Sequence, residues 1–89
     1  MKINLSSHFK RAYQKIPRHI QKDFDAKIAI FIKNLRHPSL KTHKLQGKHQ
    51  SCLAFRLRDG FRVLFEFPAP NTADLLDIGS RDIYRQRKK

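Results

Sequence analysis

The period of the hydrophobic pattern changes near the middle of the chain. In the first half, apolar residues recur every three or four positions, which is the spacing of one helix face. They form two consecutive stripes: Leu5, Phe9, Ala12 and Ile16, then Ile20, Phe24, Ile28, Phe31 and Leu35. From Leu53 onward, apolar and polar residues alternate instead, as in a half-buried strand. The first half is therefore predicted to be mainly helical and the second half to form a sheet.

Local signals predict where the first elements begin and end. Met1–Leu5 has the pattern of a short strand, and Ser6 or Ser7 can cap the first helix. Pro17 suits the first position of a second helix, since its missing N–H is not needed there. That helix should end at residues 36–38, because the residue before a proline avoids the helical region. The two helices are therefore expected to form a hairpin.

The second half predicts three strands. Asp59-Gly60 is a strong tight-turn signal between the strands Leu53–Arg58 and Phe61–Phe67. After a loop at 68–72, Ala73–Ile78 should form a third strand, and its adjacent leucines indicate burial on both faces. The predicted fold class is α+β, with an N-terminal strand, a helical hairpin and a three-stranded antiparallel meander in a mostly antiparallel sheet.

Length and composition limit the possible classes of protein. At 89 residues and 39% hydrophobic content, the chain can form one small domain, which we expect to span residues 1–89. No apolar stretch approaches the length of a membrane span, and no secretory signal is apparent. The single cysteine, Cys52, excludes an internal disulfide and a cysteine-based zinc site. We therefore expect a soluble cytoplasmic protein with no membrane association.

The charge balance points to an anionic partner. Twenty Lys and Arg residues face seven Asp and Glu, which gives a formal charge of +13 at pH 7. A field of this sign on a small body attracts polyanions, of which nucleic acid is the commonest. An anionic membrane surface or an acidic protein would satisfy the same charge. Charge alone leaves these alternatives open.

The predicted hairpin carries arginines on one face. If its Phe-rich face packs on the helices, then Arg56, Arg58 and Arg62 lie on the opposite face. Arg56 and Arg62 flank the same turn and should be neighbours across the hairpin. Like charges that face each other destabilise a sheet, so the cluster favours a bound anion that offsets the repulsion.

Three segments resemble the RelE/ParE toxins, the small basic toxins of bacterial toxin–antitoxin pairs. They are His43-Lys44-Leu45-Gln46-Gly47, Phe55 to Phe65 with its Gly60-Phe61-Arg62-Val63 hairpin, and Leu76 to Arg85 with Gly79-Ser80-Arg81 and Tyr84. They match a Lys-Leu-x-Gly before the sheet, a Gly-aromatic-Arg-hydrophobic hairpin and a Gly-x-Arg…Tyr ending. The three segments occur in the family's order, and the resemblance covers nearly the whole chain, including the helical hairpin.

The resemblance implies one of two activities. RelE-like members cleave messenger RNA, usually on the ribosome, whereas ParE-like members poison DNA gyrase and are not nucleases. In both, a cognate antitoxin inactivates the toxin, and the toxin–antitoxin complex binds operator DNA. We expect an endoribonuclease with an acidic antitoxin partner. A gyrase poison, or a non-toxic basic nucleic-acid-binding domain, is the alternative.

Metal-free RNA cleavage defines which residues the site needs. It requires help in deprotonating the 2′-hydroxyl, cations that stabilise the phosphorane, and an acid for the leaving oxygen. Arginine forks bind phosphate bidentately, so Arg56, Arg62 and Arg81 are the candidate clamp. Tyr84 corresponds to the late tyrosine of RelE-like nucleases, which stacks on a base or assists proton transfer. The candidate RNA-binding residues are Lys44, Lys48, Arg58 and Arg85. We expect no metal and no other cofactor, because the few carboxylates form no tight pair for magnesium.

The chain departs from the RelE-like pattern at the position of the general base. Relatives tend to carry lysines on the strand before the hairpin turn, where this chain has Ala54 and Arg56. Arginine is a poor base because it stays protonated. His43 and His49 flank the Lys44–Lys48 loop, and either imidazole has the chemistry for proton transfer. The sequence leaves the identity of the base open.

Overall fold

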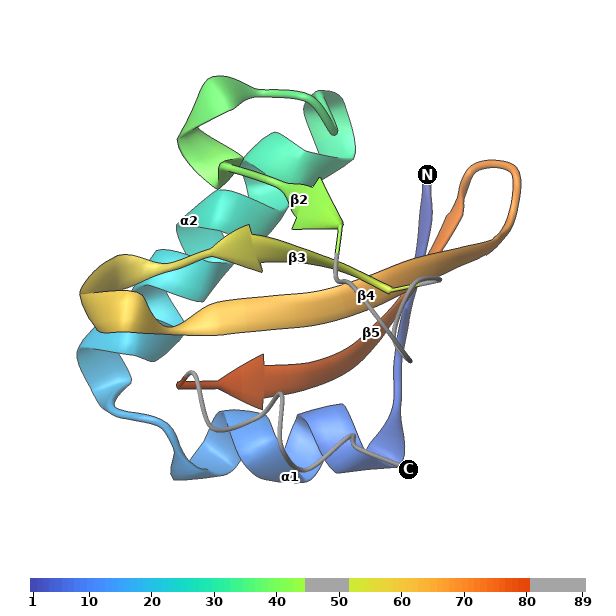
Figure 1. Ribbon diagram of the computed structural model, residues 1–89. Helices are drawn as coiled ribbons and strands as arrows, with labels where there is room; N and C mark the ends of the chain where they lie inside the picture. Colours follow the sequence, from blue (N-terminus) through green and yellow to red (C-terminus); the bar gives the residue numbers. More distant parts are fainter. Residues whose placement is uncertain (45–51, 81–89) are drawn as a thin grey trace.

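The computed structural model describes residues 1–44 and 52–80. Its helices and strands are β1 (Lys2–Leu5), α1 (Ser7–Lys15), α2 (Arg18–Lys33), β2 (His43–Lys44), β3 (Leu53–Arg56), β4 (Arg62–Ala69) and β5 (Thr72–Gly79). A short 3₁₀ turn at Pro38–Leu40 precedes β2, and a tight turn at Arg58–Gly60 precedes β4. Figure 1 shows this arrangement in sequence colours. Neither helix is long and apolar enough to cross a membrane within these described ranges.

The five strands form one mixed sheet in the order β1-β5-β4-β3-β2. β3, β4 and β5 form the predicted antiparallel meander, and β1 pairs with β5 in parallel. The α+β class is therefore confirmed. The strand β2 is an addition, because residues His43 and Lys44 were predicted to lie in a loop and instead pair with β3. Two residues are too few for an alternating pattern that would predict a strand. The strand β2 forms only because the edge of β3 is available for pairing.

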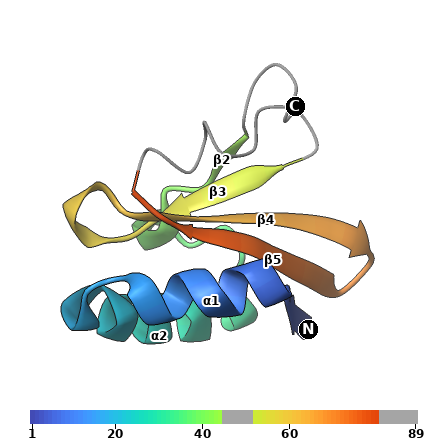
Figure 2. The same ribbon diagram turned by 90° about the horizontal axis from the view of Figure 1, so that it is seen from below.

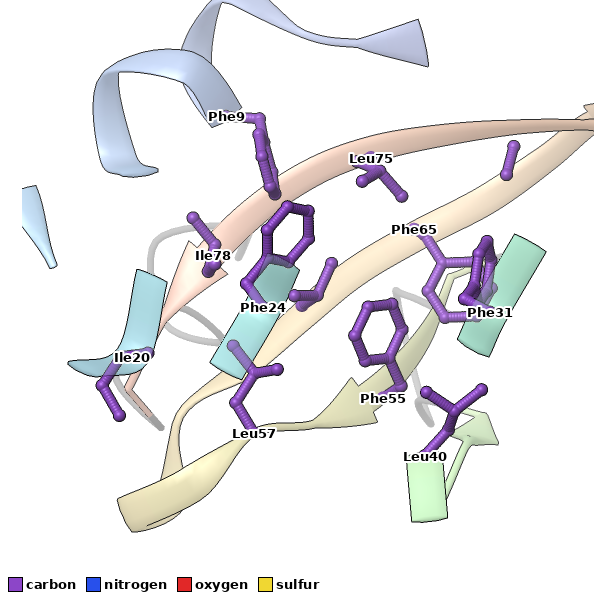
Figure 3. Close-up of a cluster of buried hydrophobic side chains, with 12 residues drawn as sticks. Phe9, Ile20, Phe24, Phe31, Leu40, Phe55, Leu57, Phe65, Leu75 and Ile78 are labelled. Carbon is purple, nitrogen blue, oxygen red and sulfur yellow. The ribbon is translucent and has the colours of Figure 1, made fainter. Parts of the chain in front are cut away.

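Both helices cover the same face of the sheet (Figure 2). The main core lies between them and this inner face, and Figure 3 shows its aromatic centre. Its buried members are Phe9, Ile20, Phe24, Phe31, Leu40, Phe55, Leu57, Val63, Phe65, Ala73, Leu75 and Ile78. The helical stripes and the alternating strand residues of the sequence meet here, as their periods predict.

The ends of the helices differ in detail from the predicted ones. Ser6 caps α1 as expected, with its hydroxyl accepting the Phe9 N–H at 2.9 Å. Leu5 was assigned both to the strand Met1–Leu5 and to the first helical stripe; it ends β1, as the first assignment predicts, and is 42% exposed. Pro17 is the N-cap of α2 rather than its first helical residue. The helix ends at Lys33, before the predicted boundary, because Asn34 adopts an extended conformation.

The outer face of the sheet also buries apolar side chains. Ala54 and Leu64 are fully buried there, and Leu76 packs against them. The register shifts between Leu64 and Phe65, which pair with Asp77 and Leu75, so that Leu76 is the extra residue of a bulge in β5. The predicted burial of this strand on both faces is therefore confirmed. The outer face is partly apolar and not only a surface for arginines.

Candidate anion-binding site

The hairpin between β3 and β4 closes in a tight turn. Asp59 and Gly60 have φ angles of 57° and 78°, and the Phe61 N–H donates to the Arg58 carbonyl at 3.0 Å. Positive φ at both central residues is typical of a type I′ turn, for which Asp-Gly is a preferred pair. The Leu57 N–H also donates to the Phe61 carbonyl at 2.7 Å. The predicted turn is confirmed, and the bond at Leu57 extends the hairpin beyond the end of β3.

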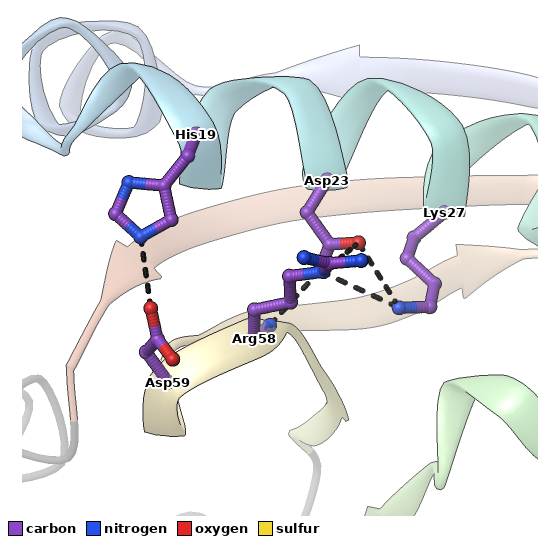
Figure 4. Close-up of polar contacts among 5 residues, drawn as sticks. All are labelled: His19, Asp23, Lys27, Arg58 and Asp59. Carbon is purple, nitrogen blue, oxygen red and sulfur yellow. Dashed lines mark hydrogen bonds and ion pairs between the residues drawn. The ribbon is translucent and has the colours of Figure 1, made fainter.

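Two acidic residues connect this turn to α2, as Figure 4 shows. The Asp23 carboxylate accepts the Arg58 backbone N–H at 2.9 Å and the Lys27 ammonium at 3.3 Å. On the adjoining turn, Asp59 contacts the His19 imidazole at 2.8 Å. Asp23 is nearly buried, so its contacts are less screened by water than those of the exposed His19–Asp59 pair. Asp23 is therefore the main polar anchor of the turn.

Arg56 and Arg62 are direct partners across the hairpin, as the sequence predicts. Arg62 is 8% exposed, and its Nε and Nη2 both donate to the Gly60 carbonyl, at 3.2 and 3.1 Å. Arg56 is exposed at the end of β3. One guanidinium is thus held against the turn, while its neighbour is free to reach a ligand from the strand.

These arginines line a cleft of about 290 Å³ beside the turn. We call it the turn cleft, and its lining residues are Lys27, Ser39, Lys41, Arg56, Leu57, Arg58, Gly60 and Arg62. Five of them carry cationic side chains, contributed by α2, β3, β4 and the segments after Pro38 and Leu57. The Asp23 carboxylate contacts two of these cations, Lys27 and Arg58. The remaining excess of positive charge makes the turn cleft a site for an anion.

Arg58 does not share the outer face with Arg56 and Arg62, contrary to the prediction from alternation. The strand ends at Arg56, and the chain turns toward α2, where the Arg58 Nε lies 3.9 Å from Asp23. Its side chain is 75% exposed. An ion pair of this length and exposure contributes little, so the guanidinium stays available to a ligand in the turn cleft.

Lys27 and Lys41 are members of the cleft that sequence reasoning missed. Lys27 belongs to the helix α2 and lies four residues after Asp23, a spacing that favours an ion pair along the helix. Lys41 has a φ of 48°, which is uncommon for a residue other than glycine and is found at functional sites more often than elsewhere. The sequence does not reveal that these two lysines lie near the arginines, because the cleft forms only when α2 packs beside the hairpin.

The chemistry of the turn cleft is that of binding and charge stabilisation. Lysine ammonium and arginine guanidinium groups are cations at neutral pH and suit the oxygens of a phosphate. Among the described lining residues, no histidine or carboxylate is present to transfer a proton. Residues 1–44 and 52–80 also contain no cluster of three side chains with the chemistry to hold a metal ion.

The other predicted site residues lie apart from the cleft or outside the described residues. Lys44 is exposed on the edge strand β2, opposite Leu53. His43, beside it, contacts the Lys41 carbonyl at 3.2 Å through Nδ1. The described ranges do not include His49, Lys48, Arg81, Tyr84 or Arg85.

Comparison with known proteins finds similarity at the level of the fold only. No family model matches the chain, and no curated protein sequence does. YafQ from E. coli strain BL21(DE3) is similar over 93% of this chain and 96% of its own, with a TM-score of 0.75 and 16% identity. A chain of the RelB–RelE antitoxin–toxin complex from Methanococcus jannaschii matches with a TM-score of 0.76 and 19% identity, over 96% of this chain and 99% of that one. The YoeB/ParE toxin from Agrobacterium tumefaciens matches with a TM-score of 0.77 and 12% identity, over 91% and 99%. This chain therefore has the fold of the RelE, YafQ and YoeB/ParE toxins.

Proposed function

We propose that this chain, which has the RelE/ParE toxin fold, is the toxin of a toxin–antitoxin pair and cleaves messenger RNA. The observation that carries the proposal is the turn cleft, where five cationic side chains surround a space of about 290 Å³ on that fold. An RNA phosphodiester is an anion of suitable size, and its negative charge increases locally as the phosphorane forms. Cations arranged in advance around that charge stabilise the transition state more than the ground state.

In this proposal, Arg56 and Arg62 hold the scissile phosphate from the two strands of the hairpin. Both residues line the cleft, and the backbone contact of Arg62 limits its rotation before the substrate arrives. Arg81 and Tyr84 complete the clamp and the proton-transfer set, as the family resemblance implies. Arg58 binds the RNA backbone beside the clamp, and Lys44, Lys48 and Arg85 contact the backbone or the ribosome.

The proposed reaction is a metal-independent transesterification. A general base takes the proton of the 2′-hydroxyl as its oxygen attacks the adjacent phosphorus, the bond from phosphorus to the 5′-oxygen breaks, and the leaving oxygen receives a proton. The product is a 2′,3′-cyclic phosphate or the 3′-phosphate formed when water opens it. Since no described lining residue of the turn cleft is a histidine or a carboxylate, the protons move through other groups, of which Tyr84 is the first candidate.

An acidic antitoxin is the partner that we propose for the free toxin. A chain with a charge of +13 binds nucleic acid without discrimination, and an acidic segment over the turn cleft neutralises that field. Similar structures include complexes with antitoxins, such as the intact E. coli RelBE toxin–antitoxin complex. Binding to operator DNA then belongs to the complex rather than to the toxin alone.

The lack of a histidine or carboxylate among the described lining residues also favours one other candidate, a ParE-like poison of DNA gyrase. A cleft that binds phosphate without a group for proton transfer suits a protein that binds its target and cuts nothing. This candidate predicts growth arrest with intact message and with DNA trapped in gyrase cleavage complexes.

Induced expression with mapping of transcript 5′ ends tests the proposal. Three chains are compared: the wild type, Arg56→Gln in the turn cleft, and Arg18→Gln as a control. Arg18 is exposed at the start of α2 and lines none of the clefts described. Each variant therefore loses one positive charge, and the two variants differ only in where that charge is lost. Measured protein levels and thermal unfolding verify that all three chains are folded.

We expect new 5′ ends within translated frames for the wild type and for Arg18→Gln, and at least tenfold fewer for Arg56→Gln. Such a loss corresponds to about 1.4 kcal/mol of transition-state stabilisation. Equal cutting by all three chains would remove Arg56 from the site. Growth arrest without cuts, together with trapped gyrase, would replace the ribonuclease by the alternative.

A further inference from the structure

A buried carboxylate lies at the opposite side of the hairpin from the turn cleft. Asp77 of β5 is 1% exposed, and its Oδ1 accepts the Ile78 N–H at 2.8 Å. The same oxygen lies 3.1 Å from Nε2 of His8 on α1. The second oxygen, Oδ2, is buried and has no hydrogen-bond partner among residues 1–44 and 52–80. A carboxylate in this state costs free energy, so its presence calls for a role beyond packing.

The bulge at Leu76 decides which face of the sheet Asp77 occupies. Strict alternation would place Leu75 and Ile78 on opposite faces of the sheet, yet both belong to the inner core. The extra residue resets the alternation, so that Asp77 pairs with Leu64 of the outer face. Asp77 still contacts His8, because α1 packs against β5.

His8 is the first of three basic residues along one face of α1. Arg11 and Lys15 follow it by three and seven positions, so the three side chains lie on the same side of the helix. They border a cleft of about 460 Å³ between α1 and the end of β5, which we call the α1 cleft. Its lining includes Asp77 at the base and the apolar side chains of Pro17 and Phe61.

The α1 cleft has the chemistry to bind a phosphate. Arg11 and Lys15 are exposed cations, whereas Asp77 is too deeply buried to meet a ligand directly. The carboxylate instead fixes the His8 ring through Nε2, so that Nδ1 remains for the ligand. Pro17 and Phe61 add an apolar wall of the kind on which a nucleobase packs.

The two clefts adjoin the same hairpin turn. Gly60 and Arg62 line the turn cleft, while Phe61 between them lines the α1 cleft. Arg62 also pairs with Gly79, which lines the α1 cleft from β5. A strand bound at the turn cleft therefore has a second group of cations within its path.

We propose that the α1 cleft is a second RNA-binding site, in which Arg11, Lys15 and an Asp77-oriented His8 hold one nucleotide of a single strand next to the turn cleft. The shared chemistry is that of a phosphate, and the choice of RNA rests on the proposed function. Asp77 is a positioning residue, because it acts through His8.

A binding measurement that needs no cleavage tests this site. The probe is a single-stranded oligonucleotide of 2′-O-methyl RNA, which lacks the attacking hydroxyl. Its affinity is compared for the wild type, the Arg11→Gln/Lys15→Gln variant and a Lys22→Gln/Lys33→Gln control. Lys22 and Lys33 are exposed on α2 and line none of the clefts, so both variants lose two charges. The NMR signals of the His8 imidazole report occupation of the site directly.

We expect the Arg11/Lys15 variant to bind at least tenfold more weakly and to show a smaller salt slope, with the control within about twofold of the wild type. The His8 signals should shift with RNA, shift less with inorganic phosphate, and respond weakly in a folded Asp77→Asn variant. Equal weakening of both charge variants would overturn the site in favour of a diffuse field. A polyglutamate peptide that shifts His8 as strongly as RNA would overturn the choice of ligand.

The outcome is separable from that of the proposed function. Arg56→Gln should leave the shift of the His8 signals with RNA in place, because Arg56 does not line the α1 cleft. A wild type that binds RNA at His8 but cuts no message in cells would refute the ribonuclease and retain this site. A wild type that cuts message without any shift of the His8 signals would refute this site and retain the ribonuclease.

Discussion

Tyr13 is the residue whose ionisation the fold changes most clearly. Its ring packs against Phe9 and Phe24, and its hydroxyl donates to the Asp25 carboxylate at 3.1 Å. Burial, together with the hydrogen bond and the negative charge of Asp25, raises the pKa of Tyr13 above its ordinary value of 10.0. All three causes disfavour the phenolate, so the folded state holds this proton more tightly than the unfolded chain does.

The raised pKa predicts a specific loss of stability in alkali. Below about pH 10 the full contribution of neutral Tyr13 is present, and it disappears as pH rises through the folded-state pKa. Tyr13→Phe keeps the ring and removes the ionisation. We expect it to lower the free energy of unfolding by about 1 kcal/mol at pH 7 and to lose less stability than the wild type above about pH 10. Urea unfolding across this range measures both effects, and parallel curves for the two proteins would contradict the assignment.

At the scale of elements, the position of the hairpin turn against α2 depends on Asp23. This carboxylate accepts the Arg58 N–H at 2.9 Å and lies near two cations of the turn cleft. The hydrogen bond matters more than the Arg58 ion pair, which is long and exposed. The hydrogen bond that Asp23 accepts therefore determines the geometry of the cleft more than the negative charge of Asp23 does.

Two substitutions at Asp23 separate the acceptor from the charge. Asp23→Ala leaves the Arg58 N–H unpaired and should cost about 1–3 kcal/mol, whereas Asp23→Asn keeps an acceptor and should cost less. Asp59→Asn is the control, because it removes only the negative charge from the exposed contact with His19 and suits the φ of 57°, so we expect a change within about 0.5 kcal/mol. Chemical denaturation gives the three values. Equal costs for Ala and Asn would show that charge, not the hydrogen bond, holds the turn.

Sequence periodicity predicted the elements because each of their signals is local. The stripe that includes Phe24 and Phe31, the alternation from Leu53 and the Asp59-Gly60 pair each act within a few residues. The neighbours Arg56 and Arg62 followed from the turn between them. Local signals of this kind fix helices, strands and hairpins, and with them the α+β class.

The composition of the candidate sites depends on contacts that the sequence does not show. Lys27 enters the turn cleft from α2, and Arg58 leaves the predicted arginine face because the strand ends early. Burial of Leu64 on the outer face has no counterpart in the alternating pattern, which treats that face as exposed. His8 and Asp77 lie 69 positions apart and meet only because α1 packs against β5. Tertiary packing decides each of these cases.

At the scale of the whole molecule, the excess positive charge has two opposite consequences in salt. The whole chain has a formal charge of +13, and the structure has a radius of gyration of only 12.0 Å. The Debye length is about 10 Å at 0.1 M salt, so charges on different elements repel one another at low ionic strength. Added salt should therefore stabilise the folded chain while it weakens the binding of RNA.

Phosphate separates general screening from occupation of the clefts. We expect sodium chloride to raise the melting temperature between 0.02 and 0.3 M, by several degrees for about 1 kcal/mol of relieved repulsion. At matched ionic strength and pH, sodium phosphate should raise it further, because an anion that binds only the folded state adds stability by mass action. The further increase should shrink in Arg56→Gln and in the Arg11→Gln/Lys15→Gln variant but persist in Lys22→Gln/Lys33→Gln. Identical melting curves in the two salts would mean that neither cleft binds phosphate, and a fall with chloride would mean that the ion pairs of Asp23 and Asp77 outweigh the repulsion.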